Sequence, residues 1–293
     1  SAAGGRTVAE MLDQLLTLLP DQGQGDELTR PRPLIAIVGR PNVGKSSFVN
    51  AVIGKPHRVV TDIAGTTRDA ADTVVTFYGQ QMTLIDTAGL RRQSRVSEAL
   101  EFYTTVRTER ALRECDVAVV LTDAQEGVVG QDIRILQLAE EMGKGILLCV
   151  NKWDLVEKDE RTADRQHREI KNRYGSLDYV PVMFISALES QRVFKVLEQL
   201  LRIHEERQKR ISTPELNRFN KDMMETNPPP SVKGRDIRIH YVTQPQAEPP
   251  LFIFWSGHPE LITENYHRFL ERKLREQYGY EGVPIRLAFR KRT

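Results

Sequence analysis

The chain has 293 residues, of which 40% are hydrophobic and 28% charged, and its formal net charge is +2. This is ordinary globular composition, which excludes a disordered, collagen-like or disulfide-rich chain. No stretch reaches the ~18 consecutive apolar residues of a membrane span, and the first residues, SAAGGRTVAE, lack the features of a signal peptide. We therefore expect a cytoplasmic monomer without a membrane partner, whose two cysteines, Cys115 and Cys149, are reduced core residues.

The chain opens with a segment that is similar to a later one. Residues 1–20 align without gaps to residues 186–205, and 7 of the 20 positions are identical. Either two amphipathic helices share their leucine spacing by chance, or the chain begins with the tail of a missing copy of its own large domain. Residues 21–33, DQGQGDELTRPRP, are typical of a flexible linker.

From residue 34 to about 206, short apolar runs alternate with longer segments of helical spacing. The runs are LIAIVG, DVAVVLTD, GILLCVNKWD and VPVMFIS, and helical spacing marks 129–142, 159–174 and 191–206. This alternation predicts an α/β domain, with a mostly parallel sheet that helices cover on both faces. The run TVVTFYGQQMTLID, with its turn at Gly79, predicts a hairpin that adds one antiparallel edge strand.

The pattern changes after residue 207. A helix over 213–226 precedes the breaker NPPPSVKG, strands around DIRIHYVT and PPLFIFWSG, a long amphipathic helix over 259–278 and a last strand, VPIRLAFR. This order predicts a small α+β domain of αββαβ type. Residues 207–293 hold 16 Lys+Arg against 10 Asp+Glu, so this part carries a charge of +6 and the rest −4.

The motif GRPNVGKS, Gly39 to Ser46, fits GxxxxGKS and stands between a predicted strand and a predicted helix. Gly39 and Gly44 allow backbone amides to close on phosphate oxygens. Lys45 supplies a positive charge to the β and γ phosphates, and the Ser46 hydroxyl can enter a Mg²⁺ shell. The sequence therefore predicts a triphosphate site, whose other nucleotide-binding loop residues are Asn42, Val43 and Ser47.

NKWD places Asn151, Lys152 and Asp154 at the end of a predicted strand, where ligands bind in open α/β sheets. The Asp154 carboxylate is an acceptor that faces two donors of guanine, the N1 proton and the 2-amino group. Adenine would leave that buried charge unpaired. Such a site can therefore favour guanine over adenine nucleotides by a factor of about 10⁴. We expect the Lys152 stem to cover the purine plane, and Trp153 to pack within its own domain.

Three further segments have weaker motifs whose value lies in their position. In DTAG, Asp86 can hold Mg²⁺ through water, and the Gly89 amide can meet the γ phosphate. A threonine of GTTRD, residues 65–69, could complete the metal shell. In SAL, Ala187 could offer its amide to the guanine O6, and the flanking residues expected at the nucleotide are Ser186 and Leu188.

These five elements, in this order, resemble those of the translation-factor-related GTPases, and the chain looks like a member of the Der (EngA) family. That family has two tandem P-loop GTPase domains followed by a KH-like domain. The resemblance matches 34–206 to a GTPase domain, 207–293 to the KH-like domain, and 1–20 to the end of the first GTPase domain. It implies a fragment that lacks most of that first domain, with GTP or GDP, Mg²⁺ and K⁺ as its cofactors.

The resemblance also implies roles that spacing does not show. Asn42 resembles the asparagine that helps to coordinate K⁺ in potassium-activated members, and Thr67, with Thr66 as the alternative, is the candidate for Mg²⁺. Leu90 follows DTAG where other GTPases have a glutamine that orients water. Hydrolysis is therefore expected to be slow, and to depend on Lys45, the Gly89 amide, Mg²⁺ and the monovalent cation. The chain departs from the family after SAL, where ESQRV replaces a glycine-containing turn.

By resemblance, the function is a GTPase switch in assembly of the large ribosomal subunit in bacteria, with guanine nucleotide, that subunit and ribosomal RNA as partners. The switch loops are 55–70 and 86–98.

GYEG, 279–282, has the GxxG pattern of a KH-type clamp, but it joins a helix to a strand, which favours a cap and turn. The candidates for RNA contacts, with a solvated basic surface as the alternative, are Arg286, Arg290, Lys291 and Arg292, and in the loop after DTAGL Arg91, Arg92 and Arg95.

Two alternatives belong to other classes of function. The chain could be a nucleotide-dependent binding platform with negligible turnover, which Leu90 and the missing first domain favour. It could also be an ATP-dependent kinase that shares the phosphate loop, which NKWD disfavours. Turnover in K⁺ against Na⁺ separates the first alternative from the enzyme, and competition between GTP and ATP tests the second.

Overall fold

The computed structural model describes residues 33–54, 72–93, 101–157, 159, 161–173, 175, 178–232 and 234–291. The repeat at 1–20 and the linker at 21–32 lie outside the described residues. So do the GTTRD segment with Thr66 and Thr67, the residues Arg95 and Arg292, and the side chains of Arg91 and Arg92.

The larger sheet has six strands in the order β2–β3–β1–β4–β5–β6. Their bounds are β1 Leu34–Gly39, β2 Thr73–Phe77, β3 Gln80–Leu84, β4 Val117–Asp123, β5 Gly145–Asn151 and β6 Val182–Phe184. All neighbours pair in parallel except β2 and β3, which form the predicted antiparallel hairpin. Its turn has positive φ at Tyr78 and Gly79. The α/β class and the antiparallel edge predicted from the sequence are thus confirmed.

Helices cover both faces of this sheet, because successive side chains of a strand point to opposite faces. Ile35 and Ile37 of β1 join a core with α2 (Lys45–Ile53) and α7 (Val193–Gln208). Ala36 and Val38 join a second core with α4 (Glu101–Glu114) and α5 (Gly130–Glu141). The remaining helices of this part are α3 (Thr87–Gln93) and α6 (Thr162–Arg173). Burial on both faces explains why the strands read as continuous apolar runs.

The smaller sheet has the order β7–β8–β9, with β7 antiparallel and β9 parallel to β8. Its elements are α8 (Thr213–Thr226), β7 (Ile239–Gln246), β8 (Leu251–Ser256), α9 (Glu264–Tyr278) and β9 (Arg286–Lys291). The predicted αββαβ order is confirmed, but the single helix predicted over 259–278 is wrong. Pro259–Leu261 forms a separate 3₁₀ turn, η3, and extended backbone at Ile262 and Thr263 separates it from α9.

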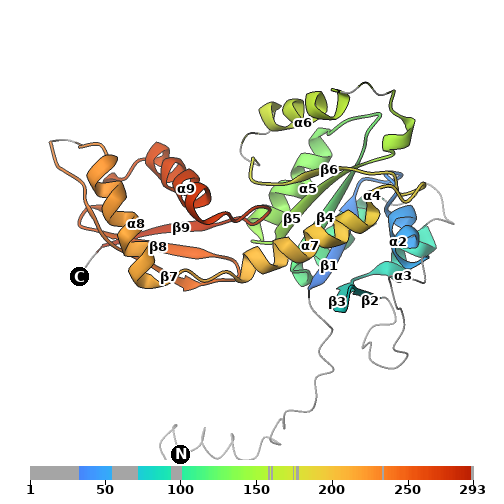
Figure 1. Ribbon diagram of the computed structural model, residues 1–293, viewed down its shortest axis with the longest axis horizontal. Coiled ribbons are helices and arrows are strands. Elements are labelled where there is room, and N and C mark those ends of the chain that lie inside the picture. Colours follow the sequence, from blue (N-terminus) through green and yellow to red (C-terminus); the bar gives the residue numbers. More distant parts are fainter. Residues whose placement is uncertain are drawn as a thin grey trace, which may run out of the picture.

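The long helix α7 runs from the larger sheet toward the smaller one (Figure 1). The GYEG loop that follows α9 contacts both parts of the chain through its two buried residues, Tyr280 and Gly282. Tyr280 has no exposed surface, the Gly282 amide donates to the Tyr179 carbonyl at 2.8 Å, and the Ile146 amide donates to the Gly282 carbonyl at 2.7 Å. The loop is therefore a helix cap and turn, as predicted, and its backbone is engaged within the protein.

Gly282 shows why this loop needs a glycine. Its φ is 70°, and a Cβ there would lie 2.8 Å from Ile203 Cγ1 and 2.9 Å from the Ile146 carbonyl oxygen. Glycine alone combines this conformation with so close a backbone approach. The second glycine of the GxxG pattern therefore serves the contact between the two parts of the chain.

A buried ionic cluster lies at the same junction. Arg207, near the end of α7, is 5% exposed, and its Nη1 lies 3.4 Å from Asp116 Oδ1 and 3.7 Å from Glu248 Oε2. Asp116 also accepts a 2.9 Å hydrogen bond from the Leu34 amide. This cluster connects the starts of β1 and β4 with the β7–β8 loop.

Both cysteines are buried, as predicted. Cys115 is 1% exposed and Cys149 is fully buried. Burial raises the pKa of the Cys115 thiol to about 12 and raises the pKa of the Cys149 thiol further. Neither thiol is therefore a reactive thiolate at neutral pH.

Candidate nucleotide-binding site

The GRPNVGKS loop connects the end of β1 to the start of α2, the arrangement that a phosphate loop requires. Gly39 and Gly44 have φ of 144° and 97°. A Cβ on Gly39 would lie 2.4 Å from the Leu121 carbonyl oxygen, and one on Gly44 would lie 2.2 Å from Asn151 Nδ2. Beyond the predicted opening for phosphate, these glycines therefore let the loop pack against β4 and against the NKWD motif.

The Lys45 side chain folds back over this loop. Its Nζ donates to the Gly39 carbonyl at 2.8 Å and to the Arg40 carbonyl at 2.5 Å. Burial, and then the positive charge of Arg107, lower the pKa of Lys45 to about 8. An anion beside Nζ would offset both effects, which is the environment that a triphosphate provides.

Asn151 joins three of the motifs. Its Nδ2 donates to the Val43 carbonyl at 2.8 Å, and its Oδ1 accepts from the Ala187 amide at 2.9 Å. The first asparagine of NKWD thus connects the phosphate loop with SAL instead of projecting freely toward a ligand. The Ala187 amide, which the sequence predicts to face the guanine O6, donates to Asn151 in the structure.

Asp154 lies on the 3₁₀ turn η1 (Trp153–Leu155) that follows β5. Its Oδ1 is buried and has no hydrogen-bond partner within the described part of the chain. An unpaired buried carboxylate oxygen is unfavourable unless a ligand supplies donors. Guanine supplies two, so the residues present fit a guanine base.

The neighbours of Asp154 have distinct roles. Lys152 adopts a left-handed φ of 63° and its Nζ pairs with Asp123 Oδ2 at 2.6 Å, which anchors the end of the stem expected to cover the purine. Trp153 is buried and packs on Phe184, with ring centroids 4.4 Å apart. Packing of the tryptophan within its own part of the chain was predicted and is confirmed.

The residues expected on the Mg²⁺ side have protein partners. The Ser46 hydroxyl donates to the Leu90 carbonyl at 2.6 Å, and the Asp86 carboxylate accepts two hydrogen bonds from Arg107, one of them at 2.6 Å. Gly89 lies inside α3, beside the Arg107 guanidinium, whereas the motif alone placed it at the end of a strand. Hydroxyl and carboxylate oxygens are the donors that Mg²⁺ prefers, so the chemistry of the set fits that ion.

The SAL segment turns sharply without a glycine. Ser186 and Gln191 exchange two backbone hydrogen bonds, and the Ser186 hydroxyl accepts from the Glu189 amide. Ser190 and Arg192 take the positive φ values, 57° and 61°, that a glycine would adopt more readily. Ser186 is buried, whereas Leu188 is exposed.

In the phosphate loop, the predicted residues Asn42 and Ser47 are exposed, and Asn42 has a φ of 63°.

Sequence reasoning missed Arg107 and Asp123 as members of this site. Both act through a partner that is distant in sequence: Arg107 reaches Asp86 from α4, and Asp123 holds Lys152 from the end of β4. Neither lies in a nucleotide-binding motif. Asp123 could have been suspected, because it ends a strand at the carboxyl edge of the sheet.

The candidate RNA-contacting residues of β9 lie apart from the nucleotide site. Arg290 and Lys291 are exposed on β9, whereas Arg286 donates to the Glu141 carbonyl across the junction.

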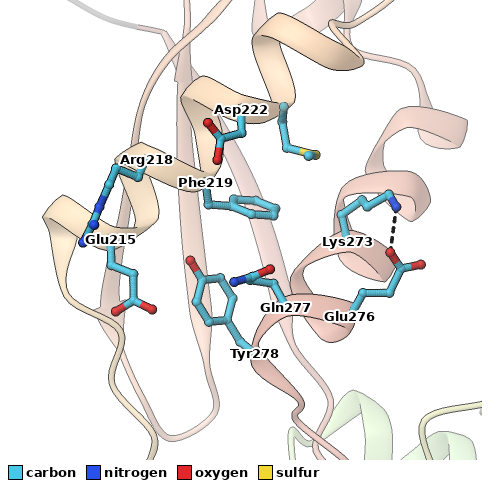
Figure 2. Close-up of a pocket in the computed structure, with 9 residues that line it drawn as sticks. Glu215, Arg218, Phe219, Asp222, Lys273, Glu276, Gln277 and Tyr278 are labelled. Carbon is cyan, nitrogen blue, oxygen red and sulfur yellow. Dashed lines mark hydrogen bonds and ion pairs between the residues drawn. The ribbon is translucent and has the colours of Figure 1, made fainter.

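A groove of ≈ 500 Å³ between α8 and α9 has Phe219 and Tyr278 among its lining residues (Figure 2). Three acidic and two basic side chains also line this groove, so its charge does not favour a phosphate backbone. They are Glu215, Asp222, Glu276, Arg218 and Lys273.

A phosphate loop after the first strand of a mostly parallel sheet, with NKWD at the same edge, defines the class of P-loop GTPases. Residues 34–152 match the family model described as "50S ribosome-binding GTPase", and residues 210–290 match "KH-domain-like of EngA bacterial GTPase enzymes, C-terminal". The chain belongs to the GTPase Der family. It is 45% identical over 294 residues to GTPase Der of Chloroherpeton thalassium, a match that covers all of this chain and 67% of that protein.

GTPase Der of Chloroflexus aggregans is similar to the same extent, 45% identical over 294 residues, and the match covers 65% of its length. A crystal structure of Era in complex with MgGDPNP and a 16S ribosomal RNA segment matches with a TM-score of 0.46 and 20% identity, over 89% of this chain and 93% of Era. Within the parts that the structure describes, no helix has the length and hydrophobicity needed to cross a membrane.

Proposed function

We propose that this chain binds GTP together with Mg²⁺ and hydrolyses it to GDP and phosphate, as a switch that acts in assembly of the large ribosomal subunit. The observation that carries the proposal is the buried, unpartnered Oδ1 of Asp154, on the turn that follows β5. Asn151, three residues earlier, bonds directly to the phosphate loop. A guanine base and a phosphate chain are the two parts of one ligand that would satisfy both ends of this site.

Each motif residue then has a role. Lys45 and the amides of the loop from Gly39 to Ser47 hold the phosphates. Ser46, Asp86 and Thr67 would hold Mg²⁺, which would supply positive charge beside the phosphates. Lys152 covers the base, and the SAL residues close the base pocket. Gly89 contacts the γ phosphate through its amide, and the Arg107 guanidinium lies beside this glycine.

Replacing Lys45 by alanine is expected to weaken GTP binding about 100-fold, because it removes charge-assisted hydrogen bonds to two phosphates. Calorimetric titration with GTP and Mg²⁺ measures the loss. Lys195→Ala, at an exposed position on α7, is the matched control and should bind GTP normally. Unchanged affinity in Lys45→Ala would refute the placement of the triphosphate.

Slow hydrolysis and stimulation by K⁺ follow from Leu90 and Asn42. The Leu90 side chain is buried and apolar, so it has no group that could orient a water molecule. Asn42 is exposed on the phosphate loop, where its amide oxygen is a ligand suited to a monovalent cation. Leu90 also supports a second candidate function, a nucleotide-dependent binding platform with negligible turnover.

Turnover should be about tenfold faster in K⁺ than in Na⁺ at equal ionic strength, since a fixed cation stabilises the charge of the transition state. Asn42→Gly tests the ligand, because glycine keeps the positive φ while removing the amide. This variant should lose the stimulation but retain GDP binding. Equal, negligible turnover in both salts would instead favour the binding platform.

We further propose a division of labour between residues 34–206, the GTPase domain, and residues 207–293, a KH-like domain that docks on RNA or on another domain. Two features support it: the charge of +6 over 207–293, and the exposed Arg290 and Lys291 on β9. The description "50S ribosome-binding GTPase" of the family that matches residues 34–152 supports the large subunit as the partner.

A further inference from the structure

Arg107 enters the proposed nucleotide site from α4, a helix outside all the nucleotide-binding motifs. Its Nε and Nη2 donate to the two carboxylate oxygens of Asp86. Bidentate pairs of this kind are among the stronger polar contacts in proteins. The side chains are 31% and 34% exposed, so solvent weakens this pair but does not abolish it.

The guanidinium also occupies space next to the residues that a triphosphate would contact. A Cβ on Gly89 would lie 0.9 Å from Arg107 Nη2, so the arginine crosses directly over this glycine. The cavity shared by Lys45, Asp86, Leu90 and Arg107 measures ≈ 20 Å³, which is room for about one water-sized species. The positive charge of Arg107 reaches Lys45, whose pKa it lowers in addition to burial.

We propose that Arg107 competes with Mg²⁺ for the Asp86 carboxylate, and thereby sets the Mg²⁺ concentration at which the site retains a nucleotide. The inference rests on the proposed function, in which Asp86 holds Mg²⁺ through water. Arg107 donates to both carboxylate oxygens and places a positive charge beside the carboxylate that the hydrated metal ion would use, so the two cations compete for Asp86. Arg107 is thus a positioning residue that acts on the site through Asp86.

Opening the pair has a consequence for the neighbouring helices. Ser46, the other Mg²⁺ candidate in the described residues, is bonded to the Leu90 carbonyl of α3. The Ser46 oxygen can bind the metal through a lone pair while the hydroxyl still donates to the Leu90 carbonyl, so entry of the metal competes with one contact, that of Arg107 from α4. α3 begins inside DTAG, at Thr87, whereas α4 follows that motif in the chain, so opening of the Arg107–Asp86 pair transmits the presence of the metal to α4.

The test is a Mg²⁺ titration of the dissociation rate of a fluorescent GDP analogue. In Arg107→Ala the Mg²⁺ concentration for half-maximal retention should fall about tenfold, because Asp86 no longer has a competing cation. Arg107→Lys keeps the charge without the bidentate geometry and should fall between this variant and the original chain. Arg110→Ala removes an exposed arginine of the same helix, paired with Glu114, and should leave the midpoint unchanged. An unchanged or higher midpoint in Arg107→Ala would overturn the proposal.

Two further measurements separate this inference from the proposed function. If the original chain binds neither GDP nor GTP at any Mg²⁺ concentration, the proposed function fails, and the competition for a nucleotide-bound metal fails with it. The ion pair itself is tested without nucleotide, by a double-mutant cycle of Arg107→Ala and Asp86→Asn in chemical unfolding. A coupling of about fivefold in the unfolding equilibrium constant is expected, and its absence would overturn the competition even where nucleotide binds normally.

Discussion

Asp154→Asn is expected to lower the affinity for GTP about 10⁴-fold and to transfer the preference to xanthosine triphosphate. The carboxylate offers two acceptors to the N1 proton and the 2-amino group of guanine. An asparagine amide keeps one acceptor but presents an NH₂ to the 2-amino group, leaving donors opposed and unpaired. Xanthine has an oxygen at that position, which accepts from the amide.

Equilibrium binding of GTP, xanthosine triphosphate and ATP to the same samples measures this change. The matched control is Glu157→Gln, an exposed carboxylate three residues further on, which should leave all three affinities unchanged. The buried Oδ1 of Asp154 has no hydrogen-bond partner in the described part of the chain, so its replacement breaks no internal contact of that atom, and the free energy of unfolding should not fall. A variant that still prefers GTP would show that Asp154 does not face the base.

Arg207→Ala is expected to lower the free energy of unfolding by about 3–5 kcal/mol, because it removes a cation that faces the buried Asp116 carboxylate. The side chains of Arg207 and Asp116 are 6% and 8% exposed, so solvent cannot replace the lost partner. Glu248, in the β7–β8 loop, loses its contact at the same time. Denaturant unfolding measures the effect.

Arg202→Ala, at an exposed position on the same helix, is the control and should change stability by less than about 0.5 kcal/mol. Combining Arg207→Met with Asp116→Asn tests the cause. The double variant should be less destabilised than the sum of Arg207→Met and Asp116→Asn, because the buried Asp116 charge is removed together with its cation. Additive effects would assign the loss to packing of the arginine stem instead of to the ion pair.

The GYEG loop illustrates how a short motif depends on its surroundings. The four letters alone are compatible with a nucleic-acid clamp or with a helix cap. The order of elements favoured the cap, and the structure adds that Gly282 is bonded to Tyr179 and packs on Ile203. The loop therefore joins the KH-like part to the sheet that carries the nucleotide motifs.

The sequence by itself determined the two architectures and the nucleotide motifs. Apolar runs at strand length, helical periodicity and the glycine spacing of GRPNVGKS are local properties, set by the period of each element and by the backbone conformations that glycine allows. For the same reason the hairpin at Gly79 and the αββαβ order were predictable. The boundary at Ile262 was not, because a 3₁₀ turn that leads into a helix shares the helical pattern.

Only the tertiary structure decided which groups of the motifs are engaged. Arg107 holds Asp86 from 21 residues away, Asn151 bonds to the phosphate loop from 108 residues away, and Arg207 neutralises Asp116 across 91 residues. Such contacts depend on how strands and helices are placed beside one another, and no periodicity along the chain encodes them. The motifs thus predict which residues can bind a nucleotide. Tertiary packing determines which protein contacts those residues make in the structure.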